Sequence, residues 1–239
     1  LMSSYGLTDT GKLRKVNQDS FVIVDNEKLF LGVVCDGIGG NNAGEIAADL
    51  AAKVMASYFN GGYKAENQVE KMHNAIDVAN LAVYKKGNEV DTCKGMGTTL
   101  VAAYVDDECT LIANVGDSRA YIVTQENELV QITEDHTLIN DLINKHGFNE
   151  ELARQVVGKN VISRAIGVFE KVEAEVFEIK QDYKTILLCS DGLHGFVDDE
   201  EIKEILLSKG TVENKAKKLI KRANDAGGLD NITALIYQR

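Results

Sequence analysis

The sequence predicts an α+β fold, a layered sandwich in which one domain takes up all of residues 1–239. Short runs of β-branched and aromatic residues alternate with turn signals, as in antiparallel sheets. Two pairs of segments with helical spacing interrupt these runs, whereas regular strand-helix-strand units are missing. No low-complexity tract, internal repeat or linker-like change of composition divides the chain, so a single domain is expected.

The first half of the chain begins with two strand-like runs, SFVIVD at 20–25 and KLFLGVVC at 28–35, joined by a polar turn. Apolar residues then recur at steps of three and four, which predicts a helix over 43–59 and a second one over 69–83. Polar residues before and within the first turn are expected to cap and open the earlier helix: Asn41, Asn42 and Glu45.

The spacing changes to that of strands over 97–133, where turn signals at Asp106-Asp107, Gly116-Asp117 and Glu126-Asn127 predict an antiparallel meander. Residues 137–160 are polar and locally helical. The remaining predicted elements are strands at 172–179 and 184–190, helices at 199–208 and 211–226, and a last strand at 232–238.

The composition restricts the classes of partner. Lys and Arg total 26 against 37 Asp and Glu, for a formal net charge of -11. Such a surface repels nucleic acid and anionic membranes, so neither is expected as a partner. The N-terminal residues lack a signal-peptide core and no apolar stretch is long enough to span a bilayer, so a cytoplasmic protein is expected. The cysteines lack C-x-x-C spacing, which disfavours zinc and predicts reduced, largely buried thiols: Cys35, Cys93, Cys109 and Cys189.

Four aspartates occupy similar local positions, where an apolar run meets a glycine-containing turn: Asp36 in VVCDG, Asp117 in NVGDS, Asp191 in LCSDG and Asp230 in GGLDN. Any one of them could be an ordinary turn residue. If the runs are neighbouring strands, however, the carboxylates converge and repel one another unless cations are bound. Carboxylate and carbonyl oxygens suit Mg²⁺ or Mn²⁺, and paired ions of this kind recur in phosphoryl chemistry.

Arg14 carries a planar fork that matches the oxygens of a phosphate dianion, although an arginine taken alone is more often a solvated surface side chain. The glycine-rich DGIGGNNAGE lacks the spacing of nucleotide-binding loops. No cysteine begins a C-x₅-R loop, which argues against a cysteine-dependent phosphatase.

An ordered series of motifs runs through the whole chain from residue 14 to residue 233: RKVNQD, DGIGG, GMGTT, VGDSR, TEDH, ISRAIG, CSDGL and LDNIT. This series resembles the metal-dependent Ser/Thr protein phosphatases of type 2C, the PPM family, and most of all its compact bacterial branch. The resemblance implies a four-layer αββα sandwich, with two central antiparallel sheets flanked by helix pairs. It also implies a small flap beside the active site, at about 137–165.

The resemblance further implies a binuclear Mn²⁺ or Mg²⁺ centre with two tightly bound ions and a third, weaker one. Asp36 would bridge the two ions and the carbonyl of Gly37 would bind the second. Asp191 and Asp230 would complete the first, and Asp117 with Asp191 would hold the third. Arg14 would bind phosphate, while Asp19 would orient metal-bound water and Asn231 would support Asp230.

The chain departs from the family pattern at a few positions. Gln18 stands where some members carry Glu, Asn41 where many bacterial relatives have His, and Ile38 where animal relatives have a histidine proposed as general acid. Protonation of the leaving alkoxide by such a histidine is therefore not expected from this sequence. His136 in TEDH is interpreted as structural.

The predicted function is the hydrolysis of phosphoserine and phosphothreonine in proteins by a metal-activated water, with Arg14, Asp36 and Asp191 as the catalytic residues. Phosphorylated proteins, as substrates of a Ser/Thr kinase, are the expected partners, and the chain is expected to be a monomer. Two alternatives stay open. One is a phosphatase-like module that binds phosphoproteins without turnover, and the other is a sporulation- or stress-type phosphatase that acts on a regulator of transcription.

Overall fold

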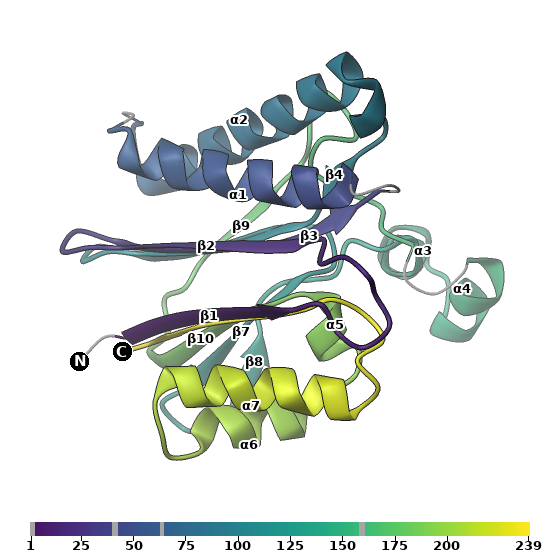
Figure 1. The fold of residues 1–239 in the computed structure, drawn as a ribbon. Helices are drawn as coiled ribbons and strands as arrows, with labels where there is room; N and C mark the ends of the chain where they lie inside the picture. Colours follow the sequence, from purple (N-terminus) through teal and green to yellow (C-terminus); the bar gives the residue numbers. More distant parts are fainter. Residues whose placement is uncertain (1–2, 40–42, 63–64, 158–160) are drawn as a thin grey trace.

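Two antiparallel β-sheets lie face to face, and a pair of helices covers the outer face of each (Figure 1). The computed structural model describes residues 3–39, 43–62, 65–157 and 161–239. Helices α1 (Ala43–Asn60) and α2 (Gln68–Glu89) form one outer layer. Helices α6 (Asp199–Leu207) and α7 (Val212–Asp225) form the other. The predicted α+β sandwich is confirmed.

The two sheets divide the strands as follows. The sheet against α6 and α7 runs in the order β1 (Ser3–Asp9), β11 (Ile232–Gln238), β10 (Tyr183–Cys189), β7 (Arg119–Thr124) and β8 (Leu129–Gln131). The sheet against α1 and α2 runs β2 (Asp19–Asp25), β3 (Phe30–Ile38), β5 (Leu100–Val105), β6 (Thr110–Val115) and β9 (Glu175–Glu178), with the short β4 (Gly97–Thr98) paired to the end of β3. A 3₁₀ turn, η1 (Asp91–Cys93), follows α2.

The meander predicted over 97–133 is wrong at its centre. β5 pairs with β6 and β7 pairs with β8, but β6 and β7 belong to different sheets. The turn at Gly116-Asp117 therefore carries the chain from one sheet to the other. Gly116 adopts a φ of 108°, which favours glycine and accounts for the turn signal. A turn signal marks where a strand ends but does not say which sheet receives the next strand.

Strand β1 has no counterpart among the predicted elements. It pairs with β11 along its whole length, from Ser3 opposite Gln238 to Asp9 opposite Ile232. Only Tyr5 and Leu7 contribute apolar side chains to the core beneath α7. A strand with so few apolar residues gains its stability from backbone pairing with β11, which a local pattern does not reveal.

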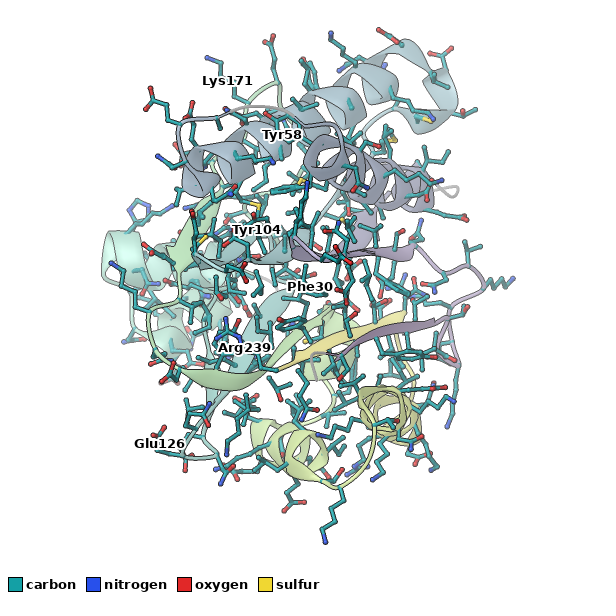
Figure 2. All side chains as sticks on the ribbon, turned by 90° about the vertical axis from the view of Figure 1, so that its left-hand side faces the viewer. Phe30, Tyr58, Tyr104, Glu126, Lys171 and Arg239 are labelled. Atoms are coloured by element: carbon teal, nitrogen blue, oxygen red, sulfur yellow. The ribbon has the colours of Figure 1, made fainter. Side chains whose placement is uncertain are left out.

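The hydrophobic core has three layers, which follow from the alternation of side chains along each strand. In β3, Leu31, Val33 and Cys35 pack toward α1 and α2. Phe30 and Val34 point the other way, into the layer between the sheets. There Phe30 stacks on Tyr237 with ring centroids 4.3 Å apart, and Figure 2 shows Phe30 between the two sheets. All four cysteines are free thiols, and Cys109 alone is only half-buried.

Two short helices, α3 (Leu138–His146) and α4 (Glu150–Val156), extend from one end of the sandwich within the predicted flap region (Figure 1). Thr137 caps α3 and Asn149 caps α4, each side chain accepting a backbone N–H from the first turn. The predicted caps Asn41 and Asn42 lie outside the described residues. No helix in the described ranges has the length and apolar character needed to cross a membrane.

Candidate metal centre

The layer between the two sheets changes from apolar to polar at the end nearest the flap. Asp36 follows Phe30 and Val34 on the same face of β3, so alternation directs its side chain between the sheets. Asp19 lies directly opposite Asp36 in the β2–β3 register. In the facing sheet, Ser190 and Thr233 occupy the corresponding positions and are buried.

Asp19 is anchored across this gap by two hydroxyl groups. Ser190 Oγ and Thr233 Oγ1 each donate to Asp19 Oδ2 at 2.6 Å, which joins the two sheets. Its other oxygen, Oδ1, is buried without a hydrogen-bond partner in the described part of the chain. Burial raises the pKa of Asp19 to about 7, against the lowering effect of the two hydroxyl donors.

Asp36 is held in place through its backbone, and its carboxyl group lies beside that of Asp191. Its N–H donates to Thr99 Oγ1 at 2.9 Å, and its carbonyl accepts from Thr99 N and Thr98 Oγ1, both at 2.9 Å. Burial raises the pKa of Asp36 well above its ordinary value, and the charges of Asp19 and other neighbouring aspartates add to this rise. The GMGTT motif therefore positions Asp36, a role that the sequence interpretation did not assign.

Asp191 begins the short helix α5 (Asp191–His194) and lies within hydrogen-bonding reach of Asp36. Burial raises its pKa, and the nearby charge of Asp230 raises it further. Asp191 Oδ1 is a second buried carboxylate oxygen with no partner among the described residues. Asp230 has partners on both oxygens: Arg14 Nη2 donates to Oδ2 at 2.9 Å, and the Asn231 N–H donates to Oδ1 at 2.8 Å.

Asn231 ties the loop that carries Arg14 to the start of β11. Its Oδ1 accepts the backbone N–H of Gln18 at 2.9 Å, and its Nδ2 donates to the carbonyls of Thr10 and Val16 at 2.9 and 3.0 Å. These three bonds fix the segment 10–18 on either side of Arg14. Asn231 therefore supports both Asp230 and Arg14.

Asp117, at the crossing between the sheets, is also buried, and its Oδ1 has no partner within the described ranges. Burial raises its pKa to about 7, with further contributions from Asp191 and Asp135. His136 fixes Gly116, the residue before Asp117. Its Nδ1 accepts the Gly116 N–H at 3.1 Å, and its own backbone N–H donates to the Gly116 carbonyl at 2.9 Å. His194 Nε2 lies 2.9 Å from the carbonyl of Asp117, a contact that the sequence interpretation did not foresee.

The glycines next to Asp36 and Asp191 allow close backbone approach. A Cβ on Gly37 would lie 2.1 Å from the carbonyl oxygen of Gly44 in α1, and a Cβ on Gly192 would lie 1.9 Å from that of Asn231. Neither position has room for a side chain. The Asp-Gly pairs are therefore the points at which α1 and β11 pack against the aspartate-bearing turns.

Replacement of Gly192 by alanine is expected to lower the free energy of unfolding by about 3 kcal/mol or more, because a rigid backbone carbonyl must move to admit the methyl group. Urea unfolding followed by circular dichroism measures this change. Gly62→Ala is the comparison, since a Cβ there would meet no atom within 4 Å, although its φ of 67° adds some backbone strain. Equal effects of the two substitutions would contradict the close packing at Gly192.

A cavity of about 450 Å³ opens beside these residues, lined by Asp117, Asp191 and Asp230 together with His194 and Phe196. Five predicted site residues are therefore gathered at one end of the sandwich, close enough for their charges to interact: Asp19, Asp36, Asp117, Asp191 and Asp230. Arg14 lies at the rim, with 52% of its side chain exposed.

The chemistry of this cluster fits hard divalent cations. Every side chain in it offers carboxylate oxygen, and three buried carboxylate oxygens lack a hydrogen-bond partner within the described ranges. Burial raises the pKa values of Asp36 and Asp191, and repulsion from the neighbouring carboxylates raises them further. Across the described residues, no three Asp, Glu, His or Cys side chains already stand at the spacing of a bound ion.

Residues 12–227 match the family described as Protein phosphatase 2C. The chain belongs to the protein phosphatase 2C family. It is 38% identical over 237 residues to "Serine/threonine phosphatase stp" of Listeria innocua, an alignment that covers 97% of this chain and 94% of that protein. Membership of the family confirms the enzyme class predicted from the motif series and implies metal dependence.

Solved structures of bacterial phosphatases superpose on the whole chain. The serine/threonine phosphatase Stp1 from Staphylococcus aureus has a TM-score of 0.89 at 34% identity and covers 100% of this chain and 95% of its own. The S. agalactiae serine/threonine phosphatase has a TM-score of 0.90 at 32% identity, with 100% and 99% covered. The type 2C phosphatase fold is thereby shown for this chain.

Proposed function

We propose that the chain hydrolyses phosphoserine and phosphothreonine in proteins with Mn²⁺ or Mg²⁺ as cofactor, two ions bound tightly and a third more weakly. The observation that carries this proposal is the cluster of converging aspartates with unpartnered buried oxygens at the polar end of the layer between the sheets. Such a cluster is unfavourable unless its charge is offset, and divalent cations offset it.

The residues that would hold the ions are those brought together at this end. Asp36 and the Gly37 carbonyl, with Asp191 and Asp230, would hold the tightly bound pair, and Asp117 with Asp191 would hold the third ion. When bound, the ions lower the pKa of a coordinated water from about 15.7 towards 7 and offset the charge of the phosphate oxygens. Asp19 is fixed by Ser190 and Thr233, and its Oδ1, which has no partner in the described ranges, would orient that coordinated water.

Arg14 would orient the phosphate at the mouth of the cavity. One of its nitrogens donates to Asp230, and a guanidinium has five N–H groups, so further donors face a ligand. The loop that carries Arg14 is fixed by Asn231, so little conformational entropy would be lost when a phosphate binds. Asp36 and Asp191 would contribute to catalysis through the ions that they would hold.

The proposed activity is tested with matched phosphopeptides that carry phosphoserine, phosphothreonine or phosphotyrosine, each assayed with added Mn²⁺, added Mg²⁺ or a chelator. Hydrolysis of the first two peptides that disappears with the chelator supports the proposal. Binding of phosphopeptide without release of phosphate would favour the non-catalytic module. Metal-independent release would exclude the cofactor assignment.

Arg14→Ala is expected to raise the KM for phosphopeptides about tenfold with a smaller loss of kcat, because the lost contact is to a non-bridging oxygen present in both substrate and transition state. Steady-state kinetics on the phosphoserine peptide give both constants. Arg14→Lys keeps the positive charge but lacks the guanidinium fork, so its KM should lie between those of the wild type and Arg14→Ala. A KM for Arg14→Ala equal to that of the wild type would remove Arg14 from the phosphate site.

The partners proposed for this site are phosphoproteins produced by a Ser/Thr kinase, and the chain is proposed to act as a monomer. The first proposal follows from the catalytic assignment, since an enzyme that removes phosphate from serine and threonine consumes the product of such kinases. Light scattering at assay concentrations tests the monomer.

A further inference from the structure

A second cavity, of about 380 Å³, adjoins the one that contains the aspartates. The two share three lining residues: Arg119, Asp135 and Thr137. The second cavity extends away from Asp117 and Asp191 toward the flap, where α3 and α4 supply part of its wall. A peptide whose phosphate reaches the aspartates has flanking residues within reach of this space, because each extended residue spans about 3.5 Å.

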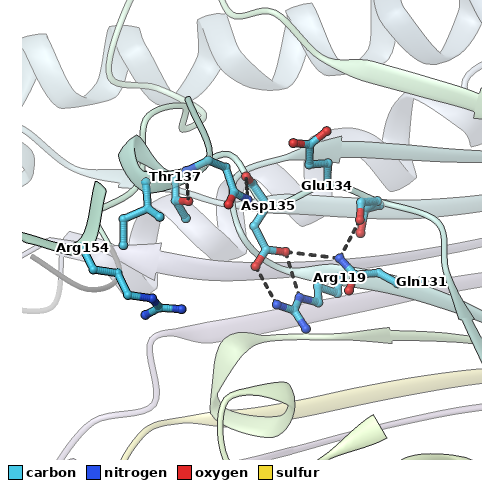
Figure 3. A pocket seen from close by; sticks show the side chains of 9 residues that line it. Arg119, Gln131, Glu134, Asp135, Thr137 and Arg154 are labelled. Carbon is cyan, nitrogen blue, oxygen red and sulfur yellow. Dashed lines mark hydrogen bonds and ion pairs between the residues drawn. The ribbon is translucent and has the colours of Figure 1, made fainter. Parts of the chain in front are cut away.

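Two guanidinium groups line the cavity from different elements. Arg119 comes from β7, and Figure 3 shows Arg154 of α4 reaching toward it from the flap. Arg119 donates from Nε and Nη2 to Asp135 at 2.8 and 2.7 Å, and from Nη1 to Tyr121 at 3.0 Å. Arg154 donates from Nε and Nη2 to Glu150, a residue of its own helix that does not line the cavity.

The acceptor groups of Asp135 and Thr137 are already used within the wall of the cavity. Both oxygens of Asp135 accept from Arg119, and the Asp135 carbonyl accepts from Asn140 Nδ2 at 2.8 Å. Thr137 Oγ1 accepts the backbone N–H of Asn140. Each guanidinium has five N–H groups, so Arg119 and Arg154 keep donors beyond these bonds. The cavity is therefore matched to a ligand that accepts hydrogen bonds.

We propose that this cavity binds the carboxylate side chain of an acidic residue close to the phosphorylated residue of the substrate. The inference rests on the proposed phosphatase function and identifies a preferred class of substrate for that site. A carboxylate offers two oxygens in the plane that a guanidinium fork recognises. Arg154, with 48% of its side chain exposed, would exchange its ion pair with Glu150 for such a ligand, whereas Arg119 is held in place by Asp135 and Tyr121.

The charges around the cavity limit how strongly the enzyme would prefer an acidic residue next to the phosphorylated one. Asp135 offsets Arg119, and Glu134, which also lines the cavity, opposes a second carboxylate. The side chain of Asn144 donates to Glu134, which satisfies one of its oxygens. With a half-exposed Arg154, the preference for an acidic residue over its amide is expected to be about fivefold in kcat/KM.

The experiment measures kcat/KM for phosphoserine peptides in which one flanking position at a time, from four residues before to four after, carries Glu, Gln or Lys. The wild type should prefer Glu over Gln about fivefold at one or two positions. Arg154→Gln should abolish this preference, and Arg154→Glu should reverse it in favour of Lys. Lys145→Glu is the matched control, since Lys145 lies in the flap and pairs with Asp141 but does not line the cavity.

p-Nitrophenyl phosphate, which has no flanking residues, separates this inference from the proposed function. Arg154 variants that hydrolyse it at the wild-type rate but lose the preference for Glu support the subsite. Three results would overturn the subsite. They are a wild type that shows no preference for Glu, a preference that persists in Arg154→Gln, and a loss of the preference to the same extent in Lys145→Glu. A wild type that fails to hydrolyse p-nitrophenyl phosphate with Mn²⁺ would instead overturn the proposed function.

Discussion

Replacement of Asp36 or Asp191 by alanine is expected to lower the kcat/KM for p-nitrophenyl phosphate with Mn²⁺ by at least about 1000-fold. Phosphate monoesters hydrolyse so slowly without a catalyst that enhancements of up to about 10²¹ are required of enzymes. This acceleration depends on charge neutralisation at the phosphate, to which both carboxylates contribute through the ions that they would hold. Initial rates over a range of Mn²⁺ concentrations measure the loss.

The Asp36→Ala variant should keep the wild-type circular dichroism spectrum, because Thr98 and Thr99 hold the Asp36 backbone in place. Asp49→Ala is the matched control, since Asp49 lies on the surface of α1, where it pairs with Lys53 at 2.7 Å. It should retain full activity. An Asp36→Ala protein with activity within tenfold of the wild type would refute the binuclear assignment.

Most of the elements follow from the sequence because their periodicity is local. The last strand was predicted at 232–238, the bounds that the structure gives it, and the first helix differs by one residue at its end. Strand β1 was not predicted, because its stability comes from pairing with β11 at the far end of the chain. The sequence predicts a turn within one sheet at Gly116, where the structure has a crossing between the two sheets. A glycine turn with positive φ occurs in either case.

For the site, too, local patterns identify some residues, whereas contacts between distant segments determine the others. Apolar runs that end in Asp-Gly mark Asp36 and Asp191, and the motif series adds Asp19 and Asn231. No local pattern shows that Ser190 and Thr233 anchor Asp19, because that contact depends on how two sheets face each other. No local pattern shows either that the ring of His136 accepts the backbone N–H of Gly116, because the two residues are 20 positions apart in the chain.

Removal of divalent cations is expected to destabilise the protein, and Asp36→Asn is expected to offset part of that loss. Ions present at about 1000 times their dissociation constant stabilise the folded state by about 4 kcal/mol. For a chain of this size, that difference corresponds to a melting temperature roughly 8 to 16 °C lower in chelator. Differential scanning fluorimetry in chelator and in Mn²⁺ measures both proteins.

The direction of the Asp36→Asn effect should reverse between the two conditions. In chelator the carboxyl group of Asp36 faces the charges of Asp19, Asp191, Asp117 and Asp230, and an uncharged amide of the same size removes this repulsion. With Mn²⁺ the same substitution removes a ligand, so the variant should gain less from the ion and melt below the wild type. Asp49→Asn on the surface of α1 should change neither temperature. A variant that melts below the wild type in chelator as well would mean that Asp36 stabilises the fold through bonds of its own, which is incompatible with a carboxylate kept for a cation.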